Sequence, residues 1–198
     1  MRLGRTPAPP FAVVGLAVLG ILLTTLQGCV PAVVAVGAGV AVSAGDPRAT
    51  GTQLEDQSVE AKVTTEAGTR YGNDIHLNVT SYNGVVLLTG EAPSAAIQDE
   101  LTKLAKAQDT VKLVHNEMVI APVTDLGDRT NDTYITSKVK TRLLSDDQVQ
   151  AIYVKVVTER SVVYLMGIVP RDLGERAAQT AAATDGVAKV VKVYQYSG

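Results

Sequence analysis

The chain repeats itself, and this repeat constrains the fold more than any other feature of the sequence. Residues 75–93 align with residues 152–170 at a constant offset of 77, and seven of the 19 positions are identical. The identical pairs are apolar residues, one glycine and one proline: Ile75/Ile152, Val79/Val156, Val85/Val162, Val86/Val163, Leu88/Leu165, Gly90/Gly167 and Pro93/Pro170. A repeat of this kind predicts two copies of one supersecondary unit.

Each copy shows the same order of predicted elements. Apolar residues at i, i+4 and i+8 predict a first amphipathic helix in each copy, through Val59, Val63 and Ala67 and through Ile135, Val139 and Leu143. Asp132 is the N-cap predicted for the second of these helices. Two strands follow in each copy. The first of them is predicted to begin at Ile75 in the first copy and at Ile152 in the second. Each copy then ends with a helix and a strand, predicted at 94–108 and 112–120 and at 171–184 and 189–196.

The two copies differ at the turn between their first two strands. Tyr82-Asn83-Gly84 is a hairpin signal, because Asn and Gly accept the positive backbone angles of a tight turn. The second copy has Glu159-Arg160-Ser161 at the same place. This difference predicts a turn that is either more strained or longer.

The element order predicts an α+β fold in which two helices cover a small three-stranded mixed sheet, twice over. A copy of roughly 65 residues buries only a marginal core, so we expect the copies to pack together. The second hairpin supports this expectation. Its outward face is apolar and would otherwise be exposed, through Val162, Tyr164, Met166 and Ile168.

The first 28 residues are typical of a secretory signal. Arg2 and Arg5 precede an apolar run at 11–26, which ends in Leu26-Gln27-Gly28-Cys29. This tetrapeptide resembles the bacterial lipobox, although Gln27 stands where a small residue is usual. The resemblance implies a signal peptide at 1–28 and a covalent lipid, such as palmitate, on Cys29. The alternative is an uncleaved membrane helix, because the run is only slightly shorter than a span.

The residues that follow Cys29 bear on its destination. Val30 and Pro31 replace the aspartate that retains such lipoproteins in the inner membrane, which implies an outer-membrane anchor that faces the periplasm. Residues 29–50 form the predicted tether, and its stretch 30–45 either lies against lipid or is a flexible spacer. The two domains are predicted at 51–121 and 131–198, with a polar linker at 122–130.

The repeat resembles the BON domain. The resemblance rests on the segment 84–90 with the strand before it and the helix start at Pro93. Together with the lipobox, Asp46-Pro47-Arg48 and Asn131-Asp132-Thr133-Tyr134, the whole arrangement is similar to the dual-BON-domain outer-membrane lipoproteins of Gram-negative bacteria. That resemblance implies binding of anionic phospholipids such as phosphatidylglycerol or cardiolipin, support of envelope integrity, and a place at the division site.

Charge and aromatic residues favour the second copy as the lipid-binding one. Residues 51–120 hold five Lys/Arg and ten Asp/Glu, whereas residues 131–198 hold nine and seven. Tyr134, Lys138 and Arg142 recur at i, i+4 and i+8 along one border of the first helix, and Lys140 lies on another face. A tyrosine beside cations suits a headgroup layer, so these four residues are the predicted lipid-binding site. The alternative is an ordinary solvated helix face.

The sequence offers little catalytic or metal-binding chemistry. It contains no nucleophile elbow, phosphate-binding glycine loop or metal-ligand motif, so neither an enzyme nor a metal or other cofactor is expected. His76 and His115 are predicted to be surface residues of strands. Asp146 and Asp147 are assigned to a turn. A net charge of −2 gives no sign of nucleic-acid binding.

A second function competes with lipid binding. The acidic first copy and the apolar outer strands would also suit a periplasmic adaptor that binds an envelope protein or a peptidoglycan-remodelling factor.

Overall fold

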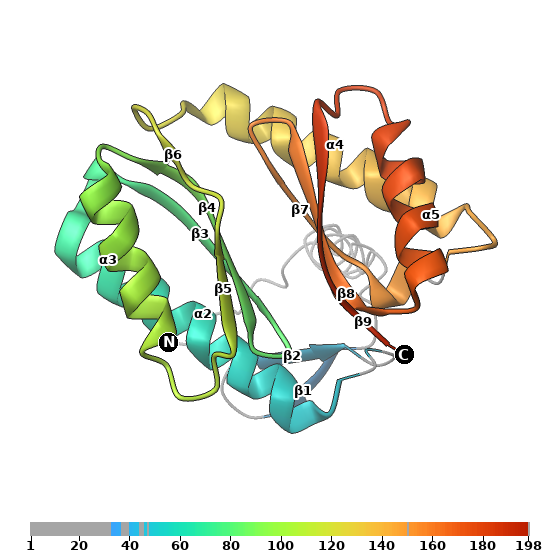
Figure 1. Cartoon of the computed structure of the whole chain (residues 1–198), viewed down its shortest axis with the longest axis horizontal. Coiled ribbons are helices and arrows are strands. Elements are labelled where there is room, and N and C mark those ends of the chain that lie inside the picture. Colours follow the sequence, from blue (N-terminus) through green and yellow to red (C-terminus); the bar gives the residue numbers. More distant parts are fainter. Residues whose placement is uncertain (1–32, 37–39, 44–45, 47, 150, 198) are drawn as a thin grey trace, which may run out of the picture.

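The computed structural model describes residues 33–36, 40–43, 46, 48–149 and 151–197. Cys29 and the predicted signal peptide lie outside these residues. The first described elements are the antiparallel strands β1 (Val33–Val36) and β2 (Val40–Ser43). Two domains of similar build follow and lie side by side (Figure 1).

The first domain has the predicted order, except that its last strand is divided. Its elements are α2 (Thr50–Tyr71), the short 3-10 helix η1 (Gly72–Asp74), β3 (His76–Tyr82), β4 (Val85–Ala92), α3 (Ala95–Lys106), β5 (Leu113–Asn116) and β6 (Val119–Ile120). A single strand was predicted over 112–120. The strand is interrupted at residues 117–118, where the Asn116 side chain accepts a hydrogen bond from the Met118 backbone N–H at 3.1 Å.

The second domain repeats this order. Its elements are α4 (Leu126–Leu144), η2 (Ala151–Tyr153), β7 (Lys155–Glu159), β8 (Val162–Val169), α5 (Arg171–Ala182) and β9 (Lys189–Tyr196). The predicted N-cap Asp132 is wrong. The helix begins six residues earlier, within the predicted linker, where the Asp125 side chain accepts a hydrogen bond from Asp128 N–H at 3.0 Å.

Both sheets are mixed, as the element order predicted. β4 pairs antiparallel with β3 and parallel with β5 and β6, while β8 pairs antiparallel with β7 and parallel with β9. The repeated glycine has a steric reason at this point. A Cβ on Gly90 would lie 2.0 Å from the His76 carbonyl oxygen, and one on Gly167 would lie 2.1 Å from the Tyr153 carbonyl oxygen.

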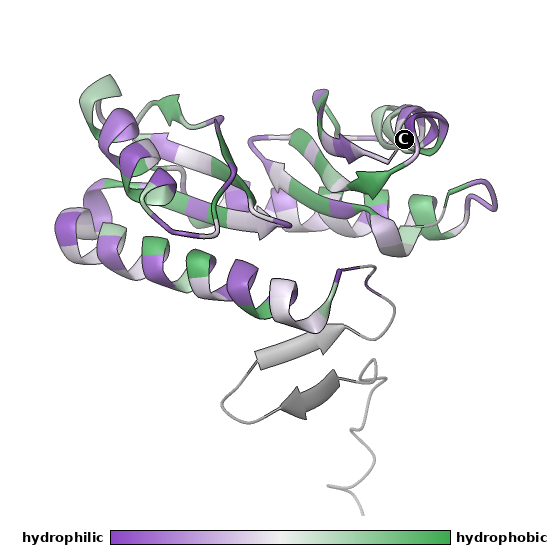
Figure 2. Cartoon of the chain, turned by 60° about the horizontal axis from the view of Figure 1, so that its bottom comes forward, coloured by the Kyte–Doolittle hydropathy of each residue, from purple (hydrophilic) through white to green (hydrophobic). Residues whose placement is uncertain are grey.

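Each domain has a core between its helices and one face of its sheet. The predicted apolar stripes of α2 and α4 are buried there: Val59, Val63, Ala67, Ile135, Val139 and Leu143. Figure 2 shows that the helices carry both hydrophobic and hydrophilic residues, as expected for helices that cover one face of a sheet.

A third core joins the two domains. The sheet faces that point away from the helices meet each other (Figure 1), and their apolar residues form one cluster: Tyr82, Val85, Leu87, Tyr164, Met166 and Val193. The apolar outward face of the second hairpin is therefore covered by the first domain. The expectation that the copies pack together is confirmed.

The same carboxylate clamp holds both hairpin turns. Asp56 on α2 accepts hydrogen bonds from the backbone N–H groups of Asn83 and Gly84, at 2.7 and 3.0 Å. Asp132 on α4 accepts the equivalent bonds from Arg160 and Ser161, at 2.7 and 2.8 Å. The second turn has the same length as the first. It places Arg160 and Ser161 at φ values of 51° and 61°, so the prediction of strain is confirmed and the longer turn is wrong.

Candidate functional site

The predicted lipid-binding residues of α4 divide into a groove and an isolated lysine. Tyr134, Lys138 and Arg142 line a shallow groove of about 420 Å³ between α4 and the loop after α5. Lys140 lies on a different side of the helix, beside an apolar pocket formed with Leu143 and Leu144. The structure thus brings three of the four predicted residues together and separates the fourth.

The groove combines an exposed ring with cations. The Tyr134 side chain is 63% exposed although it stands beside the buried stripe of α4. Lys138 Nζ lies 5.0 Å from the centroid of this ring, which is within the range of a cation–π contact. The groove therefore presents an aromatic face and an ammonium group at the same point.

Arg142 is held at the same groove by the chain itself. Its Nη1 donates a hydrogen bond to the Ala183 carbonyl oxygen at 2.5 Å, which ties α4 to the end of α5. A guanidinium has five N–H donors, so one such bond leaves capacity for an anionic ligand. The remaining lining includes the hydroxyl residues Ser137, Thr141 and Thr184 and one acid, Asp185.

The equivalent surface of the first domain lacks this chemistry. Ser58, Lys62 and Glu66 occupy the matching positions of α2, and Glu66 pairs with Arg70 one turn along the helix. The groove is therefore a property of the second copy and not of the repeated fold.

His76 is not the surface residue that the sequence predicted. Its side chain is only 14% exposed and lies between two carboxylates, Glu91 of the same sheet and Glu159 of the other domain. Sequence reasoning missed this group because the three residues come from separate strands. The cross-strand pairing of His76 with Glu91 was available from hairpin register, but the approach of Glu159 was not.

Asp146, assigned to a turn by the sequence, has structural contacts. Asp146 accepts hydrogen bonds from Arg176 Nε at 2.9 Å and from the Thr180 hydroxyl at 2.8 Å. These two bonds lower the pKa of Asp146, so the carboxylate is a poor proton donor or acceptor near neutral pH. Within the described part of the chain, no helix is both long and apolar enough to cross a membrane.

Comparison with known proteins identifies the repeat. The family model described as "BON domain" matches residues 55–122 and again residues 131–197. Among curated proteins, the outer membrane lipoprotein DolP of Haemophilus influenzae is 39% identical over 173 residues, which cover 86% of this chain and 90% of that protein.

Two further relatives span somewhat less of the chain. The 21 kDa hemolysin of Actinobacillus pleuropneumoniae is 34% identical over 153 residues, covering 76% of this chain and 79% of the relative. The osmotically inducible protein Y of Escherichia coli is 32% identical over 145 residues, covering 71% and 72%. With both copies matched by one family model and relatives aligned across most of its length, the chain belongs to the BON-domain family.

Proposed function

We propose that the protein is an outer-membrane lipoprotein, anchored through a lipid on Cys29 and facing the periplasm, whose second BON domain binds anionic phospholipid headgroups. The observation that carries the proposal is the groove of Tyr134, Lys138 and Arg142. The similarity to the outer membrane lipoprotein DolP supports the location. We also propose, from the resemblance alone, that the protein supports envelope integrity and acts at the division site without catalysing a reaction.

The groove chemistry suits a phospholipid headgroup. A phosphodiester carries a negative charge that Lys138 and Arg142 can pair with, and tyrosine is enriched where membranes meet water. The exposed Tyr134 ring costs little to insert at that depth because it is already outside the core. Asp185, which also lines the groove, repels anions, whereas Lys138 and Arg142 attract them.

The energy involved favours selection among lipids rather than attachment. Each cation near an anionic leaflet contributes about 1 kcal/mol, so Lys138 and Arg142 together supply about 2 kcal/mol. Acyl chains contribute about 0.8 kcal/mol for every buried methylene and therefore hold the protein at the membrane. Headgroup contacts then act at high effective concentration and determine which lipids surround the protein.

Flotation with vesicles tests the headgroup contact. We would use residues 46–198, which contain all three cores but not the anchor. Lys138→Glu/Arg142→Glu is expected to weaken binding to phosphatidylglycerol- or cardiolipin-containing vesicles by at least about 30-fold, since about 2 kcal/mol of attraction is removed. Binding of the unmodified fragment should fall in 0.5 M salt and be absent on neutral vesicles.

A matched variant separates the groove from net charge. Lys62→Glu/Lys140→Glu makes the same total charge change at two exposed lysines, one equivalent to Lys138 in the first domain and one on α4 outside the groove. This control should float like the unmodified fragment. Equal loss of flotation in both double variants would show that only overall charge matters, and the groove would then not be the binding site.

The adaptor function loses part of its support. It depended on apolar outer strands available to a partner, and in the structure these strands form the core between the two domains. The acidic first domain remains as its basis. If the unmodified fragment fails to float with any vesicle, an envelope-protein partner of the first domain becomes the better hypothesis.

A further inference from the structure

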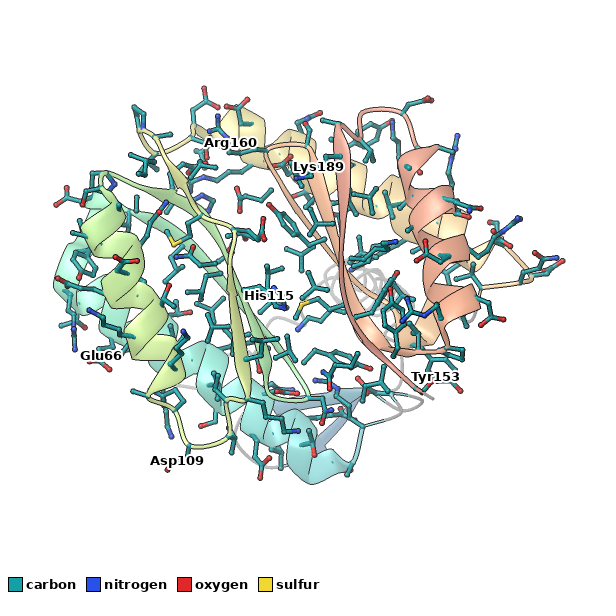
Figure 3. All side chains as sticks on the ribbon, viewed as in Figure 1. Glu66, Asp109, His115, Tyr153, Arg160 and Lys189 are labelled. Atoms are coloured by element: carbon teal, nitrogen blue, oxygen red, sulfur yellow. The ribbon has the colours of Figure 1, made fainter. Side chains whose placement is uncertain are left out.

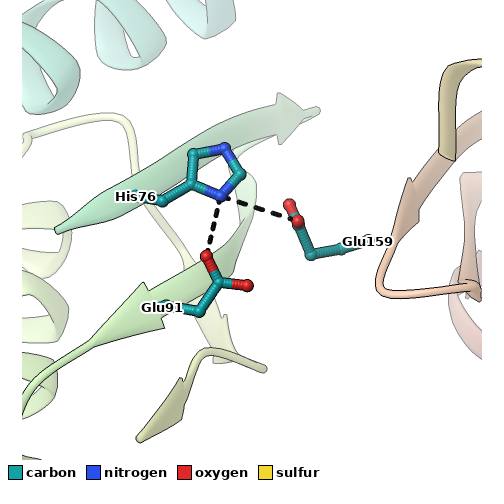
Figure 4. Close-up of side chains that lie close together, drawn as sticks. All are labelled: His76, Glu91 and Glu159. Carbon is teal, nitrogen blue, oxygen red and sulfur yellow. Dashed lines mark hydrogen bonds and ion pairs between the residues drawn. The ribbon is translucent and has the colours of Figure 1, made fainter. Parts of the chain in front are cut away.

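Two buried carboxylates and one histidine meet where the domains join. His76 of β3, Glu91 of β4 and Glu159 at the end of β7 point toward one another (Figure 4). His76 Nδ1 lies 3.0 Å from Glu91 Oε2 and 3.7 Å from Glu159 Oε1. One ligand atom from each residue lies within 4.8 Å of the others.

These separations suit a small divalent cation. Zinc binds imidazole nitrogen and carboxylate oxygen at about 2.0 to 2.2 Å, and tetrahedral angles then place the ligand atoms about 3.3 Å apart. The two distances from His76 Nδ1 fall on either side of that value. The third separation, between the Glu91 and Glu159 oxygens, is within 4.8 Å, so the three side chains would have to adjust to bind one ion at these bond lengths.

The surrounding groups hold the carboxylates in this orientation. Glu159 Oε2 accepts hydrogen bonds from Asn78 Nδ2 at 2.7 Å and from the Thr89 hydroxyl at 3.4 Å, which leaves Oε1 directed at His76. Arg160 Nη1 lies 3.3 Å from Glu91 Oε1, so Oε2 is the oxygen that faces the histidine. Hydrogen bonds to the second oxygen of a ligating carboxylate are the usual support of metal sites.

Glu91 Oε2 has a second neighbour. It accepts hydrogen bonds from the Thr124 backbone N–H at 3.2 Å and from the Thr124 hydroxyl at 3.1 Å. Both donors come from the segment that connects the domains. A cation at the cluster would therefore share an oxygen that already fixes the position of this connection.

The local charge is also in favour of a cation. The Glu91 side chain is fully buried and the Glu159 side chain is 6% exposed, so two carboxylates face each other with little water. The Arg160 guanidinium, itself 45% exposed, pairs with Glu91 and compensates one of them. A divalent ion would more than neutralise the one negative charge that remains, and metal coordination is one of the two ways in which buried carboxylates are stabilised.

There is room for a further ligand beside the cluster. A cavity of about 250 Å³ lies at the junction and is lined by His76 and Glu159 together with polar and charged residues, among them Arg129 and Asp132. Its polar lining can hold water, so a solvent molecule can occupy the fourth position of a tetrahedral site.

We propose that His76, Glu91 and Glu159 bind one Zn²⁺ ion that links the two BON domains. The site is structural in role, since its ligands come from both sides of the domain junction. A metal was not expected from the sequence, because its two histidines belong to no metal-ligand motif. The cluster uses only one of them, and its two glutamates are brought to it by the fold. This proposal does not depend on lipid binding by the groove.

The proposal is tested by calorimetry and by thermal unfolding. Both use the full-length chain in a non-ionic detergent, without a histidine tag. Titration with ZnCl₂ should show one ion bound per chain. At a free Zn²⁺ concentration about 100 times the dissociation constant, the melting temperature should rise by about 5 to 10 °C above its value in EDTA. CaCl₂ at the same concentration should leave the melting temperature unchanged.

Two variants test the ligands, and a third is their control. His76→Gln and Glu159→Gln preserve side-chain size and should abolish the rise in melting temperature, while His115→Gln, which changes the other histidine, should retain it. Cooperative melting in EDTA shows that each variant is folded. The proposal is overturned if the unmodified chain binds no Zn²⁺, if Ca²⁺ gives an equal rise, or if both ligand variants keep the full rise.

Discussion

At the scale of single residues, both hairpin turns require two successive residues with positive φ. The first turn has Asn83 and Gly84 at these positions, and both residue types adopt positive φ readily. The second places Arg160 and Ser161 in the same region, which costs an ordinary L-residue on the order of 1 to 2 kcal/mol. Arg160 lies on the side of the second domain that faces the first (Figure 3). Its side chain pairs there with Glu91, so an arginine at this strained position contributes a contact between the domains.

Relief of strain at the second turn can be measured. Ser161→Gly should stabilise the protein by about 1 kcal/mol, because glycine removes the penalty of the left-handed conformation and leaves the Arg160 ion pair in place. Chemical denaturation with urea gives the free energy of unfolding. The reverse change, Gly84→Ser, should destabilise, since a Cβ there would lie 2.6 Å from the Thr110 carbonyl oxygen. If Ser161→Gly destabilised the protein, as Gly84→Ser is expected to do, backbone strain at Ser161 would be ruled out.

At the scale of elements, each first helix is joined to its hairpin by one aspartate. Asp56 and Asp132 are equivalent in the repeat, and each is buried in the middle of a helix, where an acid without partners would be costly. The two turn N–H groups compensate this cost. The clamp explains why an acid stands at these helical positions, and it accounts for the mistaken N-cap assignment of Asp132.

Removal of one clamp should loosen the second hairpin. Asp132→Asn keeps the side-chain size but can accept only one of the two hydrogen bonds, so we expect a loss of about 1 to 3 kcal/mol in the free energy of unfolding. Urea denaturation is the measurement. Asp147→Asn is the matched control at an exposed position after the same helix, and it should change stability by less than about 0.5 kcal/mol. Similar losses in both variants would contradict the clamp.

At the scale of the whole molecule, the two sheets are joined by apolar and polar contacts. Beside the shared core, Lys155 of the second domain pairs with Glu60 of the first at 3.0 Å, and Asn83 bonds Gln195 at 2.8 Å. The junction therefore fixes the position of the α4 groove relative to the first domain.

The shared core should contribute to the stability of the whole chain. Met166 is fully buried in it, and Met166→Ala should cost about 2 to 5 kcal/mol through lost burial and the cavity that remains. Leu144→Ala, at a side chain that is 71% exposed, is the control and should cost little. Urea unfolding followed by circular dichroism compares them. An unchanged midpoint for Met166→Ala would mean that the domains do not depend on this contact.

Much of the architecture could be predicted from the sequence because it depends on periodicity. The helical stripes, the Asn83-Gly84 turn and the last strand of the second domain are local patterns, and the repeat presents the helical stripes twice. Prediction from local patterns was wrong at two places. At residues 117–118 a side-chain hydrogen bond interrupts the strand, and at the start of α4 the helix is capped by Asp125. Such hydrogen bonds leave no periodic trace.

The sequence by itself determined the two-copy α+β plan, the apolar face that joins the copies, and the placement of Tyr134, Lys138 and Arg142 on one side of a helix. Only the tertiary structure decided that this side of α4 forms a groove with the loop after α5 and that His76 is enclosed by Glu91 and Glu159. The physical reason is separation along the chain. Helical spacing fixes neighbours four residues apart, whereas Glu159 reaches His76 only because two sheets bury their apolar faces against each other.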